Sequence, residues 1–455
     1  MPSAVARARR RWLCAVSAIA VLAAVLWTSY AFALRDTQRR RGGLSPSQLT
    51  GRLRTAESPN HLLFLVEQHE TALYEQQVSA VFAWLARGAN DSRVSLGDDP
   101  TFQKLVQRTA SLLTTFRSQA LSTVLWSLAK VDYSPGRDFL ASAIEAATPQ
   151  LDSLRPQELV NCLWACARLE YQPGERFLQA VSAVAMDGIH SFDPREVANL
   201  LWSFARLDFH PGTDFLHAAV VRSGEIAFKF DTVDLANLFW SLAQLGFEGE
   251  EDLFETLLAR VEVTLPSLEP AKLASLMWAC HKLRLPPRPS LLEELPSRSV
   301  AVLTELGPRG LSFVIWTYGL IGQSPGEDFL RRALDKLSRS VPAFGYCGVQ
   351  GLSGILWACA RFDFDPGQEH VLALQSRAAE ALPEADAAQA TRLLWASAKL
   401  GYRPNDSFQQ AWLRRAKELT FEQEEVSLCL IASKRMNFTE GKALVSTLRQ
   451  AHQAA

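Results

Sequence analysis

Apolar residues recur along this chain with the spacing of an amphipathic helix. In residues 121–140, 159–178 and 197–216 they fall on one wide stripe of a helix with 3.6 residues per turn. Nothing in these segments alternates apolar and polar residues with the period of two that a half-buried strand shows. The pattern therefore predicts an all-α protein.

A tryptophan marks the same point of this pattern at regular intervals. Six tryptophans follow one another 38 residues apart, and two more come after steps of 41 and 38 residues: Trp126, Trp164, Trp202, Trp240, Trp278, Trp316, Trp357 and Trp395. A period of 20–50 residues is typical of solenoids and propellers built from one repeated unit. Below, the column of a residue is its distance in sequence from the tryptophan of its own unit, which is column 0.

Each unit reads as two helices joined by a tight turn. Column +7 is aromatic in six units, and column +9 is proline in seven of eight, often followed by glycine. Proline cannot continue a helix, and glycine permits a sharp turn. A second helical segment follows, as in residues 138–151, and Asp193-Pro194 then provides a cap and a first residue for the next long helix.

The sequence thus predicts an α-solenoid of about ten two-helix repeats of 38 residues around one continuous core, preceded by an N-terminal hydrophobic segment. Each periodic tryptophan is expected to pack between the two helices of its repeat and a neighbouring repeat. Prolines in residues 285–299 predict a broken or shortened second helix there. The expected divisions are a signal peptide or transmembrane anchor (1–34), a transit-peptide-like or disordered linker (35–60), a degenerate capping repeat (61–110), the tandem repeats (111–420) and a C-terminal capping repeat (421–455).

The N-terminal region has the composition of a targeting sequence. Residues 13–34 are uncharged and mostly apolar, which fits either a membrane span or the apolar part of a signal peptide. Residues 35–60 are rich in Arg, Ser and Thr with only two acidic residues, as in organelle transit peptides. Residues 29–33 resemble the cleavage motif in the bipartite leaders of algae with complex plastids. A plastid is therefore the favoured location and a mitochondrion the second, with membrane anchoring if residues 13–34 are retained.

Charge is unevenly distributed along the chain. Residues 1–43 carry a net charge of +7 and the whole chain −1, so the remainder carries −8. An acidic array does not bind nucleic acid through bulk charge, and any basic surface must be local. The seven cysteines contain no CxxC pair and the eight histidines are dispersed, without an HExxH, GxSxG, Walker or GxGxxG motif. We expect no catalytic residue, no metal, no cofactor and no enzymatic activity.

One column of the repeat is basic in six of eight units. Columns +4 and −3 lie on the same face of the long helix, and column +1 between them is always small. A ladder of cations and amides with little to obstruct a backbone suits a single strand, because cations contact phosphates and amides contact base edges. The predicted RNA-binding residues are Lys130, Arg168, Arg206, Lys282, Arg361 and Lys399 in column +4, with Asn161, Asn199 and Asn237 in column −3.

A structural interpretation of these columns stays open. Cations in the last turn of a helix favour the helix dipole, and they can pair with Asp132, Glu170 or Asp208. Column +4 would then be a solvated helix edge. The asparagines can likewise join neighbouring repeats by hydrogen bonds.

The unit, with its LWxxARLxYxPG core, resembles the octotricopeptide repeat of algal organelles over most of residues 75–440. It also resembles repeats of FAST-kinase-like mitochondrial proteins and of a subunit of the kinetoplastid RNA-editing substrate-binding complex. The resemblance implies an α-solenoid that binds single-stranded organellar RNA in transcript stability, processing, editing or translation, with other proteins of a ribonucleoprotein complex as further partners. The alternative is a protein-binding scaffold, membrane-anchored or not, which the −8 charge of the array favours.

Overall fold

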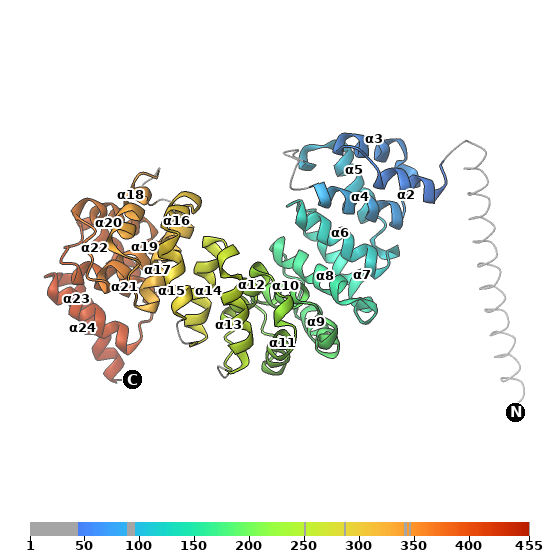
Figure 1. The fold of residues 1–455 in the computed structure, drawn as a ribbon. Coiled ribbons are helices and arrows are strands. Elements are labelled where there is room, and N and C mark those ends of the chain that lie inside the picture. Colours follow the sequence, from blue (N-terminus) through green and yellow to red (C-terminus); the bar gives the residue numbers. More distant parts are fainter. Residues whose placement is uncertain are drawn as a thin grey trace, which may run out of the picture. The chain divides into compact units, whose positions relative to one another are not determined.

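The computed structural model describes residues 44–88, 96–249, 252–285, 288–340, 344 and 347–454. Over these residues the chain is helical and contains no strand, so the all-α prediction is confirmed (Figure 1). The chain divides into two compact units, Met1–Phe177 (unit 1) and Leu178–Ala455 (unit 2). The hydrophobic segment 13–34 lies outside the described residues.

In unit 1, long helices and their following partners form two layers. The first layer contains α2 (Pro46–Arg54), α4 (Glu75–Gly88), α6 (Ser118–Lys130) and α8 (Pro156–Arg168), each packed side by side with the next. The second layer contains α3 (Pro59–Gln68), α5 (Pro100–Ala110) and α7 (Arg137–Ala147). Helix α9 (Glu175–Gly188), the partner of α8 in sequence, crosses the boundary between the units.

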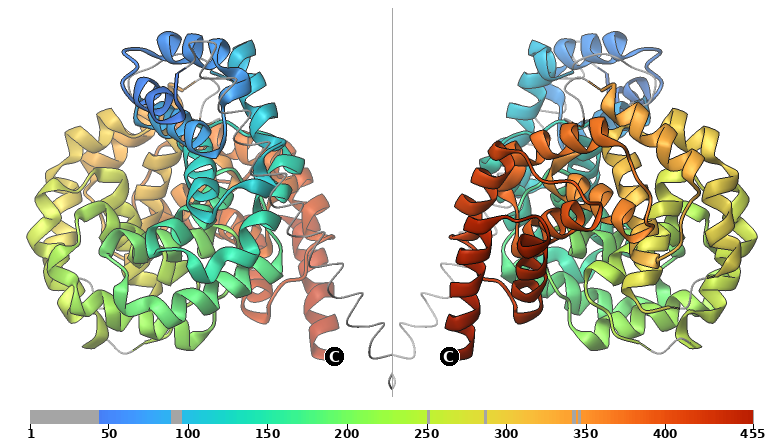
Figure 2. Two further views of the ribbon diagram at one scale, coloured as in Figure 1. Left: turned by 90° about the vertical axis from the view of Figure 1, so that its right-hand side faces the viewer. Right: turned by 90° about the vertical axis from the view of Figure 1, so that its left-hand side faces the viewer.

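Unit 2 repeats the same arrangement, with each first-layer helix packed beside the next. Figure 2 shows the helices of this unit, coloured from green to red, in chain order. Its first layer contains α10 (Pro194–Arg206), α12 (Thr232–Gln244), α14 (Pro270–Lys282), α17 (Pro308–Ile321), α19 (Gly348–Arg361), α21 (Ala387–Lys399) and α23 (Gln423–Arg435). Its second layer contains α11 (Thr213–Glu225), α13 (Asp252–Thr264), α15 (Pro289–Ser297), α16 (Ser299–Glu305), α18 (Glu327–Ser338), α20 (Gln368–Ala381), α22 (Asp406–Ala416) and α24 (Thr439–Ala454).

Short 3-10 turns complete the connections: η1 (Glu70–Ala72), η2 (Leu96–Asp98), η3 (Leu113–Thr115), η4 (Thr148–Ser153), η5 (Ile189–Ser191), η6 (Ala227–Lys229), η7 (Leu265–Ser267) and η8 (Leu382–Glu384). Two details bear on the sequence-based divisions. Helix α2 lies within the segment expected to be a linker, so the helical array begins earlier than residue 61. The second helix of the proline-dense repeat is broken into α15 and α16, as predicted.

The periodic turn after each first-layer helix has one geometry. The backbone N–H of column +7 donates to the carbonyl of column +2, for example from Tyr171 to Cys166 at 2.9 Å and from Phe209 to Phe204 at 3.0 Å. Column +6 takes a left-handed conformation, with φ of 53° at Glu170. This is the Schellman end of a helix, in which an apolar residue follows the left-handed one. The aromatic column +7 is therefore part of the stop signal.

The core between the two layers is built from columns next to the tryptophans. Phe204 in column +2 lies 5.4 Å and 5.8 Å, between ring centroids, from Phe209 and Phe215. Phe239 in column −1 lies 5.6 Å from Phe254 of the following second-layer helix. Apart from Phe209, these rings are buried. The two layers thus close on aromatic and aliphatic side chains, as the apolar stripe predicted.

The tryptophans occupy a different place from the one expected. Seven of the eight periodic tryptophans are only half-buried, and Trp278 alone is buried. A Cβ atom at Gly354 of α19 would lie 2.8 Å from the Cβ atom of Trp316 on α17, and one at Gly319 would lie 2.9 Å from the Trp357 ring. These tryptophans therefore pack in the seam between neighbouring first-layer helices. The expected packing against a neighbouring repeat is confirmed at Trp316 and Trp357, but the burial expected from enclosure between two helices as well is found only at Trp278.

The small residues of column +1 also have a different role. All eight are fully buried: Ser127, Ala165, Ser203, Ser241, Ala279, Thr317, Ala358 and Ala396. A Cβ atom at Gly319 would lie 2.9 Å from that of Ala358 on the next first-layer helix. Column +1 is small because neighbouring helices approach each other there. It does not form the open path for a ligand backbone that the sequence suggested.

Candidate nucleic-acid interface

The cations of column +4 all lie in the last turn of a first-layer helix. Lys130, Arg168, Arg206, Lys282 and Arg361 are exposed, and Lys399 is half-buried. The carbonyl ends of the helices favour positive charge at this position. Since these helices pack side by side, the cations follow one edge of the first layer within each unit, as a phosphate-contacting row requires.

At least two of these cations, in the part of the chain that the structure describes, pair with an acid of the preceding repeat's turn. An Nη atom of Arg168 lies 3.2 Å from an Oδ atom of Asp132, and Lys399 Nζ lies 3.1 Å from one of Asp363. Both acids occupy the left-handed column +6 and are largely exposed. The pairing with Asp132 is the one that the structural interpretation expected. An exposed pair contributes only about 0–1 kcal/mol, so a phosphate can replace the carboxylate.

At least two of the periodic tryptophans lie close to a cation of this row. The guanidinium carbon of Arg361 is 5.4 Å from the ring centre of Trp357, and Lys399 Nζ is 5.6 Å from that of Trp395. Each cation belongs to the same repeat as its tryptophan, four residues further along the helix. Half-buried aromatic rings beside cations are a combination that can contact both bases and phosphates.

The predicted asparagines Asn161, Asn199 and Asn237 are half-buried on the first-layer helices. The side-chain oxygen of Asn237 accepts a hydrogen bond of 2.7 Å from Lys272 Nζ on the next first-layer helix. Burial lowers the pKa of Lys272, although Glu269 and Asp234 oppose that shift. Asn237 therefore joins neighbouring repeats, as the structural interpretation allowed. Asn161 instead lines a hollow of about 250 Å³ together with Trp126 and Arg155.

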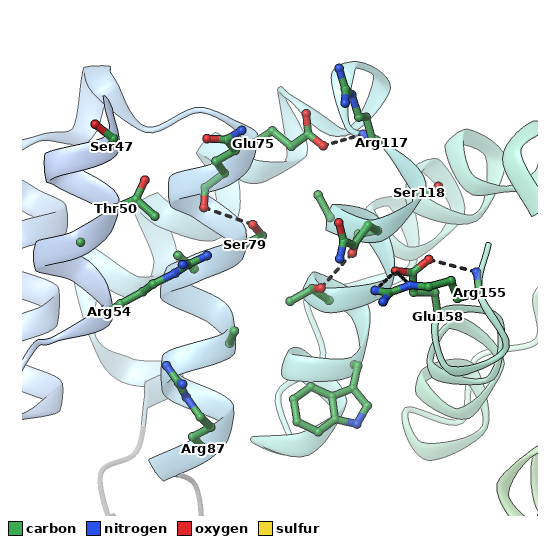
Figure 3. Close-up of a pocket in the computed structure, with 18 of the residues that line it drawn as sticks. Ser47, Thr50, Arg54, Glu75, Ser79, Arg87, Arg117, Ser118, Arg155 and Glu158 are labelled. Atoms are coloured by element: carbon green, nitrogen blue, oxygen red, sulfur yellow. Dashed lines mark hydrogen bonds and ion pairs between the residues drawn. The ribbon is translucent and has the colours of Figure 1, made fainter. Parts of the chain in front are cut away.

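A larger groove of about 1510 Å³ crosses the first layer of unit 1 (Figure 3). It runs over α2, α4, α6 and the start of α8. We call this the unit 1 groove, and its lining residues are Ser47, Thr50, Gly51, Arg54, Glu75, Gln76, Ser79, Ala80, Ala83, Arg87, Arg117, Ser118, Gln119, Ala120, Thr123, Trp126, Ser153, Arg155 and Glu158. Among these are four arginines and two glutamates.

Both glutamates of the unit 1 groove are engaged at helix starts. Glu75 accepts a 2.9 Å hydrogen bond from the backbone N–H of Arg117. Glu158 accepts 3.1 Å and 2.9 Å bonds from the backbone N–H and the Nε of Arg155, and its hydrogen bond raises the pKa of that guanidinium. In the part of the chain that the structure describes, no carboxylate pairs with the side chains of Arg54, Arg87 or Arg117.

Sequence reasoning missed these arginines. Arg54 and Arg87 lie in the last turns of α2 and α4, where later repeats carry column +4. No tryptophan in the 38-residue register marks their helices, so the column could not be extended to them. Arg117 and Arg155 are N-cap residues of α6 and α8, which the column analysis did not cover. A basic residue directly before α6 and before α8, where α10, α14 and α17 begin after Asp, Glu and Gly, was the available signal.

Cysteine positions offer no sign of metal binding. Within the described ranges no group of three or more His, Cys, Asp or Glu is arranged to hold a metal ion. Cys166, Cys280 and Cys359 are buried in column +2, and burial raises the pKa of Cys280 and Cys359 to about 12. These thiols remain protonated near neutral pH and pack as apolar side chains.

Family comparison now adds to this geometry. Residues 70–285 match the family described as Tbc2 translation factor, N-terminal domain. The matched segment reaches from η1 to the end of the turn after α14, and it contains Lys130, Arg168, Arg206 and Lys282. The match agrees with a helical-repeat protein of an RNA-related class. The more specific resemblance to octotricopeptide and FAST-kinase-like repeats stays a prediction.

Comparisons with curated proteins and with solved structures add no further information on function. No curated protein matches the chain. A homology model of the full-length AP-3 complex in an intermediate open conformation contains a chain with 10% identity, a TM-score of 0.24, and coverage of 97% of this chain and 100% of that one. The crystal structure of an engineered protein has 12% identity, a TM-score of 0.20, and coverage of 90% and 100%. Similarity at this level carries no inference.

No described helix has both the length and the apolar character required to cross a membrane.

Proposed function

We propose that this protein binds single-stranded RNA on its first helical layer and acts in organellar gene expression after transcription, in RNA stability, processing, editing or translation. The observation that carries the proposal is that six of the eight first-layer helices with a periodic tryptophan carry a cation in the last turn, and that five of these cations are exposed. The match of residues 70–285 to a translation-factor domain supports it.

The chemistry of the row suits a flexible polyanion. Arginine and lysine at equivalent positions of several helices neutralise phosphates along the strand, and the release of counterions drives association. Half-buried tryptophans near the cations supply aromatic surface for unstacked bases. The net charge of −8 over residues 44–455 is compatible with this function because, within each unit, the relevant cations lie on one edge of the first layer.

The cation row is tested by replacing Arg168, Arg206 and Lys282 together by glutamine. We expect weaker binding of a labelled single-stranded RNA, with the log–log salt slope reduced by roughly 2, because each lost contact on a single strand contributes about 0.7. Stability should change by no more than about 0.5 kcal/mol, since exposed charges contribute little. Fluorescence anisotropy over a series of salt concentrations measures both affinity and slope.

A matched control removes three exposed cations from the second helices of repeats, namely Arg137, Arg176 and Arg332. It changes net charge equally and should leave the salt slope unchanged. If the first-layer variant binds RNA as tightly as the parent and with the same slope, column +4 is only a solvated helix edge.

The targeting role of the N-terminal region belongs to the same proposal. Residues 1–60 fused to a fluorescent reporter are expected to direct it to an organelle, with the plastid favoured over the mitochondrion. A reporter that remains in the cytosol would exclude the organellar part of the proposal. Full-length protein that retains residues 1–34 and requires detergent for extraction would instead indicate a membrane anchor.

A protein-binding scaffold is the second candidate, and the acidic charge of residues 44–455 favours it. One measurement, the salt dependence of single-stranded RNA binding, distinguishes the two candidate functions. A scaffold shows no salt-dependent affinity for single-stranded RNA, whereas the proposed function requires it.

A further inference from the structure

We infer that the unit 1 groove anchors the RNA strand, with Arg54, Arg87 and Arg155 on its phosphates and Trp126 stacked against one base. The inference rests on the proposed function. It places the anchor on residues that lie mostly outside the 38-residue register, and the column +4 cations of α6 and α8 extend the contact within unit 1.

The size and lining of the groove indicate a polymer. Pockets for small ligands typically enclose about 300–1,000 Å³, whereas the unit 1 groove measures about 1510 Å³ and crosses several neighbouring helices. Its lining includes Ser47, Thr50, Gly51, Ser79 and Ala83, whose short side chains leave room along it. A groove that receives an amphipathic helix of a partner protein is apolar instead. The lining thus favours a polar, extended chain.

The charge of the groove selects an anion. Four arginines face two glutamates, so the lining is net positive in an otherwise acidic array. Both glutamates are held by hydrogen bonds at the starts of α6 and α8. Figure 3 shows Arg54 and Arg87 on the neighbouring helices α2 and α4, with Arg155 at the start of α8. Guanidinium groups at the ends of α2 and α4 and at the start of α8 can contact separate phosphates of one strand that crosses the layer.

Trp126 supplies the contact with a base. It is half-buried, and it lines both the unit 1 groove and the adjoining hollow that contains Asn161. Thr123 and Arg155 also line both, so the two hollows adjoin at these residues. An indole ring next to guanidinium groups stacks on any base, and an amide nearby can bond a base edge. The anchor therefore combines sequence-tolerant stacking with one position for base recognition.

The charge part of the inference is tested on the full-length chain with a labelled single-stranded oligouridylate. The variant Arg54→Gln, Arg87→Gln, Arg155→Gln should lose roughly 2 from the log–log salt slope, and the double variant at Arg54 and Arg87 about 1.4. The double variant leaves the Arg155–Glu158 cap intact, so it answers the question if the triple variant folds poorly. The control Lys104→Gln, Arg137→Gln, Arg176→Gln removes three exposed cations of the second helices and should keep the parental slope.

Stacking is tested separately. Trp126→Ala should weaken binding about tenfold with an unchanged salt slope, because stacking involves no counterion release. Trp126→Phe should retain most of the affinity, since a smaller aromatic ring still stacks. If Trp126 has only a structural role, Trp126→Ala should lose the cooperative thermal unfolding transition, and both the salt slope and the affinity should fall. Equal affinity of Trp126→Ala and the parent would overturn the stacking role.

The outcomes distinguish the groove from the wider function. If the double groove variant binds like the parent while the column +4 variant is impaired, the anchor is wrong and the proposed function stands. If the folded parent shows no salt-dependent binding of oligouridylate or of a mixed-sequence single strand, both are wrong. Loss of binding in the groove variants, with an unchanged control, supports the anchor.

Discussion

Replacing Phe239 by alanine is expected to destabilise unit 2 by about 4 kcal/mol, whereas replacing the adjacent Trp240 should cost only about 2 kcal/mol. Phe239 is fully buried and contacts Phe254 across the two layers, so its loss leaves a cavity. Trp240 is larger but half-buried, and part of its surface already faces solvent. The degree of burial therefore decides the loss of stability in this pair more than the size of the side chain does.

Urea unfolding followed by far-UV circular dichroism measures the two variants. Because repeats are stabilised by their neighbours, the loss at Phe239 should lower the unfolding midpoint of adjoining repeats together. A core position for the tryptophan, as the sequence first suggested, predicts the opposite order. If Trp240→Ala proves as destabilising as Phe239→Ala or more so, the seam position of the tryptophan is wrong.

This pair also marks the limit of what the sequence could predict about the fold. The helical period and the proline–glycine turn predicted the two-helix repeat, because each feature has a local physical cause. Columns −1 and 0 are both apolar, yet they differ by about 100° around the helix. One faces the second layer and the other the neighbouring first-layer helix. Both surfaces bury apolar groups, so the apolar character of columns −1 and 0 alone could not show which column faces which surface.

The same reasoning explains column +1. Small residues are expected wherever two helix backbones approach, and equally wherever a ligand backbone must pass. Ala358 is fully buried against α17, which supports helix packing as the reason for the small residues of column +1. Exposure of column +4 was predictable, because a cation in the last turn of a helix is stabilised there and seldom buried.

The unit 1 groove could not be predicted from the sequence. Its lining comes from residues as far apart as Ser47 and Glu158, and only the packing of α2, α4 and α6 side by side brings them together. The pattern of column +4 ended at Lys130, although Arg87 lies at the same point of the preceding first-layer helix. The tryptophan used as the marker was missing from the register there, and spacing alone could not replace it.

A glycine-rich seam between α17 and α19 gives the second large stability effect. A Cβ atom at Gly354 would lie 2.8 Å from the Cβ atom of Trp316, so Gly354→Leu should destabilise unit 2 by about 3 kcal/mol through overpacking. Gly224 of α11 has no heavy atom within 4 Å of its ideal Cβ, so Gly224→Leu should be neutral or stabilising by up to about 1 kcal/mol from helix propensity. Urea unfolding followed by far-UV circular dichroism compares the two variants. Equal stability of the two leucine variants would show that α17 and α19 do not approach this closely, and that the small residues of the first layer have another cause.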